Sequence, residues 1–551
     1  MLGSWLALGP AGRALAFSND GGVMVGGRPN APYGLDLADN HILSSCLQCN
    51  TGCGIRAKLQ DGVVTKIDGN PYSPWTLLPH LPYATGVDDA APVDGALCPK
   101  GQSGLQTAYD PYRIRKVLKR AGKRGENRWR TISFEQAIRE IVEGGRVFAE
   151  VEGEEQRDVE GLRALLALRD PEVAAAMASD VQTIWDEKDP ASKASLVEQF
   201  RRTHAEHLDV LIDPEHPDLG PKNNQLVLSW GRLKDGRGDL YKRFAKAFGS
   251  VNAHGHTTVC QGSLYFTGKA ISEQYVHGKF SDGKKFYWQA DTENSRFILF
   301  VGANIFAANY GPPNRTVRLT DNLINGRTRI AVADPRFSTA ASKAWRWLPV
   351  QPGTDGALAM GFIRWMLDEG RYDADFLTSA NPAAASASGE TSWTNASLLV
   401  SVVDGEPGSL VRAADVTVDG RPLAAAERRS YSDPDSGETR EYEERFFVAM
   451  VGGRPTPVDI NDTDVPVFGD LFVDTTLPDG TRVKSGLQVL LETSQEHSVA
   501  GWAELAGIDE DQLVEVAREL TSHGKAAAVD IHRGVSQHTN GFYNVLGWMT
   551  V

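Results

Sequence analysis

The 551-residue sequence lacks the features that mark several common classes of protein. Basic charge is scarce: 57 Lys and Arg face 71 Asp and Glu, for a formal net charge of −14. This balance argues against a nucleic-acid partner, because phosphate binding needs clustered cations. No apolar run reaches the roughly 18 to 20 residues of a membrane-spanning helix. Five cysteines are too few for a disulfide scaffold of this size.

Three motifs of well-characterised chemistry are also missing. The sequence contains no G-x-G-x-x-G dinucleotide fingerprint, no G-x-S-x-G nucleophile elbow and no H-E-x-x-H zinc motif. It therefore gives no support to a nicotinamide dehydrogenase, a serine hydrolase or a zinc protease. With 41% hydrophobic and 23% charged residues, the composition is that of a globular protein with an apolar core.

The first 40 residues are rich in Gly and Pro and predict an irregular leader. The opening stretch MLGSWLALGPAGRALAFSND is short and apolar, and it ends in Ala-Leu-Ala before polar residues. This pattern is typical of the apolar region and cleavage site of an export signal whose basic start is absent. A frayed N-terminus is the alternative.

Residues 41–105 predict a small β-rich module, in which GIRAKLQDGVVTKIDGNP is a β-hairpin with Asp61-Gly62 at its turn. Residues 131–145 show helical periodicity after two possible N-caps, Thr131 and Ser133.

Residues 150–222 are charged and rich in Ala and Leu, and they predict a helical insertion at the surface. His204 and His207 within it share one helical face among charged residues, so we expect both to be solvated.

Apolar strands alternate with helices over most of the remaining chain, which indicates a parallel sheet covered on both faces. We predict an α/β fold of doubly wound domains, built from residues 106–149 and 223–380. A change to Ser, Thr, Gly, Asp and Pro predicts a β-rich insertion at 381–495, and a second α/β portion begins at 496–551. The expected strands are 225–231, 296–304, 329–336 and 525–534, and the expected helices are 239–250 and 354–370.

Four of the five cysteines form a pattern typical of a metal site. Cys46, Cys49 and Cys53 have the spacing C-x2-C-x3-C, and Cys98 follows after a hairpin-length gap. Thiolates suit zinc or an iron–sulfur cluster. One tight loop that presents three sulfurs favours a [4Fe–4S] cluster, whereas zinc more often uses two C-x2-C pairs. Zinc and incidental buried thiols remain the alternatives.

The fifth cysteine, Cys260, stands apart in HGHTTVCQGSLYF. A lone cysteine is normally a buried core residue. Its neighbours are small or polar, however, and a thiolate among such groups is able to ligate a metal.

These motifs together resemble the molybdenum/tungsten bis(pyranopterin guanine dinucleotide) oxidoreductases, the dimethyl sulfoxide reductase family. The resemblance runs from about Ser44 to the last residue, outside the two insertions. It rests on an ordered set of segments: CLQCNTGCGI, GALCPKGQSGLQTAYDPYRI, SWGR, VCQGS, VGANIFAANYGPP, VADPRFSTAASKAWRWLPVQPGTDGALA and HRGVSQHTNGFYN.

The resemblance implies roles for the cysteines and for one lysine. Cys46, Cys49, Cys53 and Cys98 would hold one [4Fe–4S] cluster, and Cys260 would be the thiolate ligand of Mo or W. Lys100 matches a lysine between the cluster and the pterin; a surface lysine is the alternative.

The resemblance also implies contacts with a molybdopterin guanine dinucleotide. A Gly turn after a strand can face a pyrophosphate with its backbone N–H groups. A carboxylate can accept hydrogen bonds from ribose or guanine, although either aspartate involved is equally able to cap a helix. The implied contacts with this dinucleotide are Gly302, Asn304, Asp334, Arg336 and Asp355. A second set resembles the family's active-site-side segment near the second pterin, with a polar loop as the alternative: Arg533, Gln537, His538 and Asn540.

Within the family, VCQGSLYFTGKAISEQY and KFYWQADTENSRFILFVGAN are most similar to the catalytic subunits of tetrathionate reductases, with selenate and arsenate reductases behind. The resemblance then implies an oxyanion reductase with a quinol-oxidising membrane anchor and an iron–sulfur partner subunit. It also implies a periplasmic location after twin-arginine export, with the cytoplasm as the alternative.

The family's second half of the pterin-binding core and its C-terminal barrel would follow residue 551. We therefore expect a gene fragment or one piece of a split subunit. Two rival functions remain: a zinc-stapled binding protein, and a non-catalytic iron–sulfur electron-transfer or structural subunit.

Overall fold

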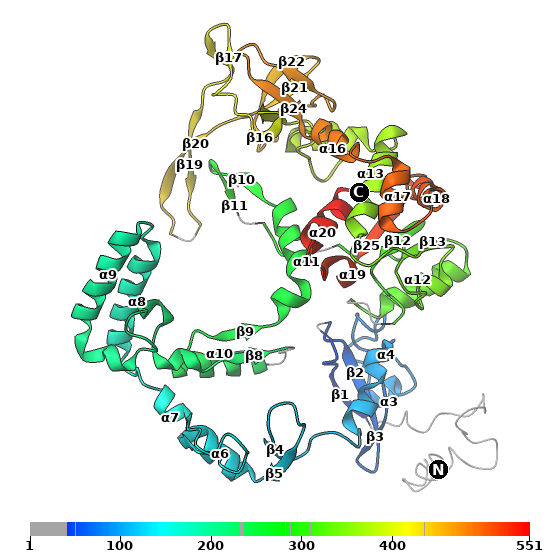
Figure 1. The fold of residues 1–551 in the computed structure, drawn as a ribbon. Coiled ribbons are helices and arrows are strands. Elements are labelled where there is room, and N and C mark those ends of the chain that lie inside the picture. Colours follow the sequence, from blue (N-terminus) through cyan, green and yellow to red (C-terminus); the bar gives the residue numbers. More distant parts are fainter. Residues whose placement is uncertain are drawn as a thin grey trace, which may run out of the picture. The chain divides into compact units, whose positions relative to one another are not determined.

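A computed structural model describes residues 41–49, 51–231, 236–281, 283–286, 288–307, 311–434 and 436–551 (Figure 1). The chain divides into two units between Thr257 and Thr258. The expected leader at residues 1–40 lies outside the described residues. Among the described helices, none is both long and apolar enough to cross a bilayer.

The first unit begins with a three-stranded antiparallel sheet, and its second and third strands are the predicted hairpin. Asp61 and Gly62 connect them with φ values of +50° and +77°, which an Asp-Gly turn adopts readily. The elements of this region are β1 (His41–Ser45), β2 (Gly54–Gln60), β3 (Val63–Gly69), α3 (Val87–Ala90), α4 (Pro99–Gln102) and α5 (Gly104–Ala108).

The strands and helices between residues 117 and 165 mainly contact elements that are close to them in the sequence. The predicted helix after Ser133 is confirmed, because the Ser133 hydroxyl accepts a hydrogen bond from the Gln136 N–H at 3.1 Å. Thr131 lies in a strand instead. The elements are β4 (Val117–Arg120), β5 (Trp129–Ile132), α6 (Phe134–Glu143), β6 (Gly144–Gly145), β7 (Val159–Glu160) and α7 (Leu162–Leu165).

Two helices, α8 (Pro171–Asp186) and α9 (Pro190–Thr203), pack around a small apolar core that includes Met177 and Phe200. The expectation that His204 is solvated is wrong. Its side chain is buried, its Nε2 lies 2.8 Å from Asp180 Oδ2, and its ring packs on Phe200. The reason is that α9 ends at Thr203, which frees His204 to turn back toward α8. Short 3-10 turns follow at Ala205–Val210, Pro217–Leu219 and Lys222–Gln225.

A strand forms within the predicted residues 225–231, but the expectation that it is a buried strand of the main parallel sheet is wrong. β8 (Leu228–Trp230) is half-exposed and, among the described residues, pairs in parallel with β9 (Ala253–Gly255) alone. The helix between them, α10 (Arg237–Phe248), ends at Gly249 with φ +80°, as predicted. The predicted domain of 106–149 and 223–380 is thus divided between the two units, because the contacts of its early part are local.

The second unit contains a four-stranded parallel sheet in the order β14-β13-β12-β25. Its strands are β14 (Arg346–Leu348), β13 (Arg329–Ala333), β12 (Phe297–Val301) and β25 (Ala527–Ile531). The helices and turns around it are α11 (Thr257–Ile271), α12 (Asn314–Ile324), the 3-10 turns Ala341–Lys343 and Gly524–Ala526, α13 (Asp355–Asp368), α17 (Val499–Ala506), α18 (Glu510–Leu520), α19 (Arg533–Ser536) and α20 (Gly541–Thr550).

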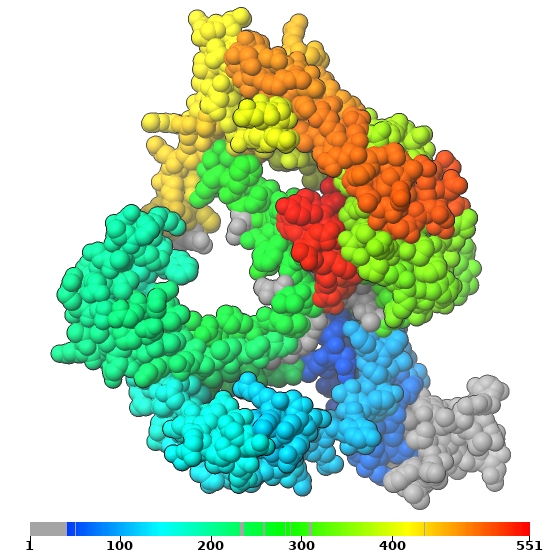
Figure 2. Space-filling view, in the orientation of Figure 1, coloured from blue at the N-terminus to red at the C-terminus, as the bar shows by residue number. Residues whose placement is uncertain are grey.

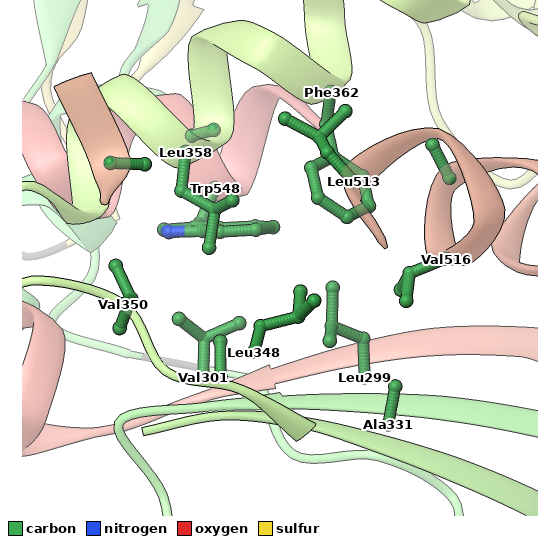
Figure 3. Close-up of a cluster of buried hydrophobic side chains, with 14 of the residues drawn as sticks. Leu299, Val301, Ala331, Leu348, Val350, Leu358, Phe362, Leu513, Val516 and Trp548 are labelled. Carbon is green, nitrogen blue, oxygen red and sulfur yellow. The ribbon is translucent and has the colours of Figure 1, made fainter. Parts of the chain in front are cut away.

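Both faces of this sheet are covered, as the continuous apolar strands predict. All five residues of β12 are buried, because alternate side chains point to opposite faces. Leu299 and Val301 face a core built with α13, α18 and α20, where Phe362, Leu513 and Trp548 close over them (Figure 3). Ile298 and Phe300 belong to the opposite core, with Leu319 of α12.

Residues 496–551 complete this same sheet, so the expected second α/β portion is not separate. β25 pairs with β12 along its whole length, from Phe297–Ala527 to Val301–Ile531. The last helix, α20, packs on α13, and its red surface lies directly against the yellow-green of α13 (Figure 2). Local periodicity does not encode a pairing between strands more than 220 residues apart.

A β-rich segment lies between α13 and α17, as predicted. Its main sheet has the order β16-β15-β24-β23 and encloses an apolar core of its own. The elements are α14 (Ala374–Thr378), α15 (Pro382–Ala387), β15 (Leu399–Val403), β16 (Glu406–Leu410), β17 (Thr417–Val418), β18 (Arg421–Pro422), β19 (Glu427–Ser432), β20 (Thr439–Glu444), β21 (Phe447–Val451), β22 (Arg454–Val458), β23 (Asp474–Thr476), β24 (Arg482–Ser485) and α16 (Gly486–Ser494).

The β-rich segment also contacts the hairpin that follows α11. This hairpin consists of β10 (Gln274–Val276) and β11 (Lys279–Ser281). The His277 ring at the hairpin tip stacks on Tyr431 with 3.5 Å between centroids. The Tyr275 carbonyl accepts a hydrogen bond from Asn461 at 2.9 Å.

Candidate functional site

Three of the four clustered cysteines lie on the loop between β1 and β2, in the region we name the cluster module (residues 41–108). The Cys46 N–H donates to the Cys53 carbonyl at 2.8 Å and closes this loop at its base. Gly52 has φ +64°, a conformation that glycine adopts freely and that lets the chain turn just before Cys53. Cys46, Cys49 and Cys53 are all buried.

A contact between two glycines brings the fourth cysteine to the module. Gly69, at the end of β3, and Gly95 exchange backbone hydrogen bonds at 3.0 Å in both directions. A Cβ on Gly69 would lie 2.5 Å from the Ala96 carbonyl oxygen, so only glycine permits this approach. Three residues beyond Gly95, Cys98 is the N-cap residue of α4.

The four thiols influence one another electrostatically. Burial raises the pKa of the Cys53 thiol to about 12, and Cys49, Cys46 and Cys98 add to the rise. Burial likewise raises the pKa of Cys46, while Lys100 opposes the rise. Four thiolates in this space require a bound cation to offset their repulsion.

The donor set fits a cluster better than one zinc ion. Four thiolates on a single Zn²⁺, each about 2.3 Å from the metal, lie close together, whereas each cysteine of a [4Fe–4S] cluster holds a different iron. In the described part of the chain, no group of three His, Cys, Asp or Glu side chains is arranged to hold one ion. The preference for a cluster therefore rests on the number and spacing of the cysteines.

The second candidate site lies at the carboxyl edge of the parallel sheet. After β12 the chain proceeds to β13 and β14 on one side, whereas β25 lies on the other side of β12. The position between the carboxyl ends of β12 and β25 is therefore a switch point of the topology, where α/β sheets bind their ligands. The segments after these two strands, which include α19, carry Gly302, Asn304, Arg533, Gln537, His538 and Asn540.

Two glycines bring the ends of these strands into contact. Gly302 has φ +57°, and a Cβ on it would lie 2.7 Å from Gly534 Cα; a Cβ on Gly534 would lie 2.5 Å from Gly302 Cα. The Gly534 N–H donates to the Gly302 carbonyl at 3.1 Å. This bare backbone fits the close approach of a pyrophosphate to main-chain N–H groups.

Several buried polar atoms near these loops have no hydrogen-bond partner among the residues that the structure describes. They are Asn304 Oδ1, Ser536 Oγ, and both amide atoms of Gln261, a side chain that is only 1% exposed. Unsatisfied groups of this kind are rare in folded proteins unless a ligand or water satisfies them. The site therefore fits a polar cofactor.

The helix that carries Cys260 packs on the same loops. The Gln537 amide donates to the Cys260 carbonyl at 3.0 Å, and the Thr267 hydroxyl donates to the Phe542 carbonyl at 3.1 Å. Cys260 itself is buried. The structure thus joins the predicted metal thiolate to the loop after β25.

Asp355 is the first residue of α13 and is only 4% exposed. Burial raises the pKa of its carboxyl to about 6, against the opposing field of His538. His538 Nε2 lies 3.8 Å from Asp355 Oδ2 and 2.7 Å from the Gly534 carbonyl. Thr354, not Asp355, is the N-cap residue of α13, and no side chain caps the helix. Asp355 is therefore not the cap of this helix, and its contact with a ligand stays a prediction.

The remaining predicted contacts are more exposed. The Asp334 carboxylate accepts a hydrogen bond from the Arg336 N–H at 2.9 Å, and the Arg336 side chain is exposed. The Asn540 amide donates to Asn544 at 2.9 Å. Lys100 lies half-buried on α4 in the first unit, so its place between cluster and pterin stays a prediction.

Sequence reasoning noted Gln261 of α11 only as a polar neighbour of Cys260, and it did not single out Gly534 or Ser536 after β25. Gly302 was predicted because a glycine follows a predicted strand. Gly534 follows β25 in the same way, so the same rule would have identified it. Reasoning also missed Asp530, a fully buried acid within β25 that pairs with Arg315 at 2.7 Å. An aspartate in the apolar run AAVDI was its signal.

Comparison with known proteins gives two family matches. Residues 41–110 match the molybdopterin oxidoreductase Fe4S4 domain, and residues 220–541 match the molybdopterin oxidoreductase domain. The first match contains the four clustered cysteines, and the second contains Cys260 and the sheet edge. The cofactors of these domains are a [4Fe–4S] cluster and a pterin-bound molybdenum or tungsten.

Individual relatives agree with these matches. A selenate reductase chain of Mesobacillus selenatarsenatis is 44% identical over 517 residues, which cover 94% of this chain and 46% of the relative. Tetrathionate reductase chains are 33% identical in Archaeoglobus fulgidus (93% of this chain, 44% of the relative) and 34% in Salmonella typhimurium (91% and 43%). The chain spans a little under half the length of these relatives. With a family model matching more than half of its residues, the chain belongs to the molybdopterin oxidoreductase family.

Proposed function

We propose that this chain is part of the catalytic subunit of a reductase that passes electrons through a [4Fe–4S] cluster to a pterin-bound molybdenum or tungsten and then to an oxyanion. One observation carries the proposal: α11, with Cys260, is hydrogen-bonded to the switch-point loop through Gln537 at 3.0 Å. Cys260, the proposed metal ligand, is thus connected to the loops around Gly302 and Gly534, which we propose bind the dinucleotide.

The bound metal supplies the two-electron redox chemistry, and the chain's own residues bind and orient it. Cys260 donates its thiolate to the metal. Gly302 and Gly534 leave room for a pyrophosphate against the backbone, and Asp355 accepts hydrogen bonds from the guanine of one dinucleotide. The unsatisfied amide of Gln261, next to Cys260, is available to the pterin.

The four cysteines of the cluster module hold the electron-entry cluster. The proposal includes a quinol-oxidising membrane anchor and an iron–sulfur partner subunit, which is supported by the names of the relatives, each of which is one subunit of a reductase. It also includes export by the twin-arginine route and work at the periplasmic face of the membrane.

For the substrate we propose selenate first and tetrathionate second. The sequence motifs favoured tetrathionate, whereas identity is 44% to a selenate reductase and 33–34% to two tetrathionate reductases. Both are oxyanions, and the same cofactor chemistry serves either.

The test is metal, pterin and activity analysis of the whole subunit, purified anaerobically. We expect about four Fe and one Mo or W per chain, and oxidation of a reduced viologen by selenate faster than by tetrathionate or arsenate. Cys260→Ala should abolish reductase activity and the Mo(V) or W(V) electron paramagnetic resonance signal of the thiolate-bound metal while keeping iron. Cys98→Ala, the matched control, should lose the cluster while keeping pterin.

Two outcomes would overturn the proposal. Iron without pterin in the whole subunit would leave only non-catalytic electron transfer as its function. Unchanged pterin and metal content in Cys260→Ala, with activity retained, would remove Cys260 from the metal site.

A further inference from the structure

A buried ion pair joins β25 to α12 next to the carboxyl edge of the parallel sheet. Asp530 is 0% exposed and lies at the fourth position of β25, opposite Phe300 of β12. Paired residues of neighbouring strands point to the same face of a sheet, so Asp530 faces the apolar core that contains Phe300 and part of α12. Its Oδ2 accepts a hydrogen bond from Arg315, in the first turn of α12, at 2.7 Å.

The same pair holds the segment that precedes β12. The Ala290 N–H donates to Asp530 Oδ2 at 3.0 Å, and the Ala290 carbonyl accepts a hydrogen bond from Arg315 at 3.1 Å. The two charged side chains therefore satisfy both backbone groups of Ala290. Three segments that lie far apart in the sequence meet at this one contact.

Hydrogen bonds continue from α12 to the loop that carries Asn304. Thr316, in the first turn of α12, donates its hydroxyl to the Ile305 carbonyl at 3.0 Å. Ile305 is next to Asn304, whose buried Oδ1 has no partner among the described residues. On the other side, β25 leads to Gly534, whose backbone contacts Gly302. The ion pair thus connects the two loops of the switch point through α12.

Stability alone does not account for this pair. Burial raises the pKa of the Asp530 carboxyl, and the field of Arg315 opposes this rise. Asp530 Oδ1 is also buried, and it accepts no hydrogen bond from the residues that the structure describes. Apolar residues of similar volume often replace a buried ion pair without loss of stability. Such replacements lose a unique arrangement before they lose stability, however, so the pair is suited to fixing the position of α12.

We propose that Asp530 and Arg315 are positioning residues of the cofactor site, and that their ion pair fixes α12 against β25 and so sets the spacing of the loops that carry Asn304 and Gly534. They act through the backbone of these loops and not by contact with the cofactor. The inference rests on the proposed function, because it requires that the two loops bind the pterin dinucleotide.

The test replaces the ion pair by apolar side chains in the whole subunit. Asp530→Leu/Arg315→Met keeps the core filled, so the midpoint of denaturant unfolding of the pterin-free protein should be at or above that of the wild type. The pterin content per chain should fall about tenfold, as when a residue that orients a metal ligand is lost. The electron paramagnetic resonance signal of the remaining Mo(V) or W(V) should broaden, because the loops adopt more than one arrangement.

Two further variants separate position from charge. Arg346→Met/Glu515→Leu removes an ion pair of 2.5 Å between β14 and α18 in the same unit, and it should keep the pterin content of the wild type. Thr316→Val keeps the side-chain shape and removes the hydroxyl that holds Ile305. It should lower the pterin content of the wild type and add little in Asp530→Leu/Arg315→Met, because both changes release the same loop.

Wild-type pterin content in Asp530→Leu/Arg315→Met would overturn the inference, and so would a loss of pterin that accompanies a lower unfolding midpoint. If this variant does not fold, Thr316→Val decides: reduced pterin content at an unchanged midpoint supports the inference, and any other result overturns it. A wild-type subunit without pterin would overturn the proposed function together with the inference. Equal pterin content in wild type and variant would overturn the inference alone.

Discussion

The cluster module and the parallel sheet bring distant residues together by different physical means. All five positions of strand β12 are buried and apolar, and the loops beyond its carboxyl end carry most of the candidate site residues. Strand β2 buries Arg56 and Lys58 and leaves its apolar residues partly exposed. The sheet therefore has an extensive apolar core, whereas the module is held together by ion pairs and glycine contacts around its clustered cysteines.

The sharpest way to break this comparison is to remove an apolar side chain from each region. Leu299 is fully buried on β12 and faces α13 and α18. Leu299→Ala should destabilise the second unit by about 2–5 kcal/mol, through lost transfer energy and the cavity left behind. The measurement is denaturant unfolding of the pterin-free protein.

The matched control is Leu59→Ala in β2, a half-buried leucine. Leu59→Ala should lower the free energy of unfolding of the cofactor-free module by much less than Leu299→Ala lowers that of the second unit. The reason is that Leu59 buries less apolar area than Leu299 does. Equal losses would mean that the module has an apolar core after all.

The two regions also differ in how a buried charge affects their stability. Asp355 at the sheet edge is a buried carboxyl whose ionisation can be followed by changing the pH. Its pKa of about 6 lies above the unfolded value of 3.8, so the folded state binds the proton more tightly. Ionisation therefore weakens the fold as pH rises from about 4 through 6. Asp355→Asn should stabilise the pterin-free protein above pH 7, by about 3 kcal/mol at most, and should have little effect below pH 4.

Thermal unfolding of wild type and variant between pH 4 and 8 measures this effect. His538→Gln is a useful companion, because removing the imidazole's field should raise the pKa of Asp355 further and move the window upward. A difference between wild type and Asp355→Asn that is independent of pH would contradict the assignment.

Both regions use a glycine–glycine contact, and a pair of substitutions compares the two. A Cβ at Gly69 would lie 2.5 Å from the Ala96 carbonyl, and a Cβ at Gly534 would lie 2.5 Å from Gly302 Cα. Each change to alanine forces backbone apart and should cost about 1–3 kcal/mol.

The cofactor content separates the two variants. Gly69→Ala should lose iron and retain pterin, because it displaces the segment that carries Cys98. Gly534→Ala should lose pterin and retain iron. If both variants lose both cofactors, the regions do not assemble independently.

The sequence predicted what local chemistry determines. The Asp-Gly turn of the hairpin, the Ser133 cap of α6 and the Gly249 end of α10 all follow from residues that favour one backbone conformation. Of the candidate site, the four cysteines and Gly302 could be identified because spacing and turn position are local properties.

Long-range pairing and polar burial could not be predicted in the same way. The placement of β25 beside β12 depends on two strands whose separation includes the whole β-rich segment. Alternation in GIRAKLQ gave no indication that Arg56 and Lys58 are buried, because their carboxylates come from other segments. His204 is buried by a partner, Asp180, that lies on the neighbouring helix.

The finest comparison of the two regions removes a single methylene from each. Ile298 in β12 is 0% exposed, and Ile298→Val should cost about 0.5–1.5 kcal/mol. Ile67 in β3 is only partly buried, so Ile67→Val should cost less than about 0.8 kcal/mol in the cofactor-free protein. Binding stabilises only the fold that it requires, so the loaded cluster should raise the unfolding midpoint of the module by the same amount in wild type and in Ile67→Val, and should leave the effect of Ile298→Val unchanged. Denaturant unfolding with and without iron measures both effects, and an iron-dependent change at Ile298 would show that the sheet relies on the cluster too.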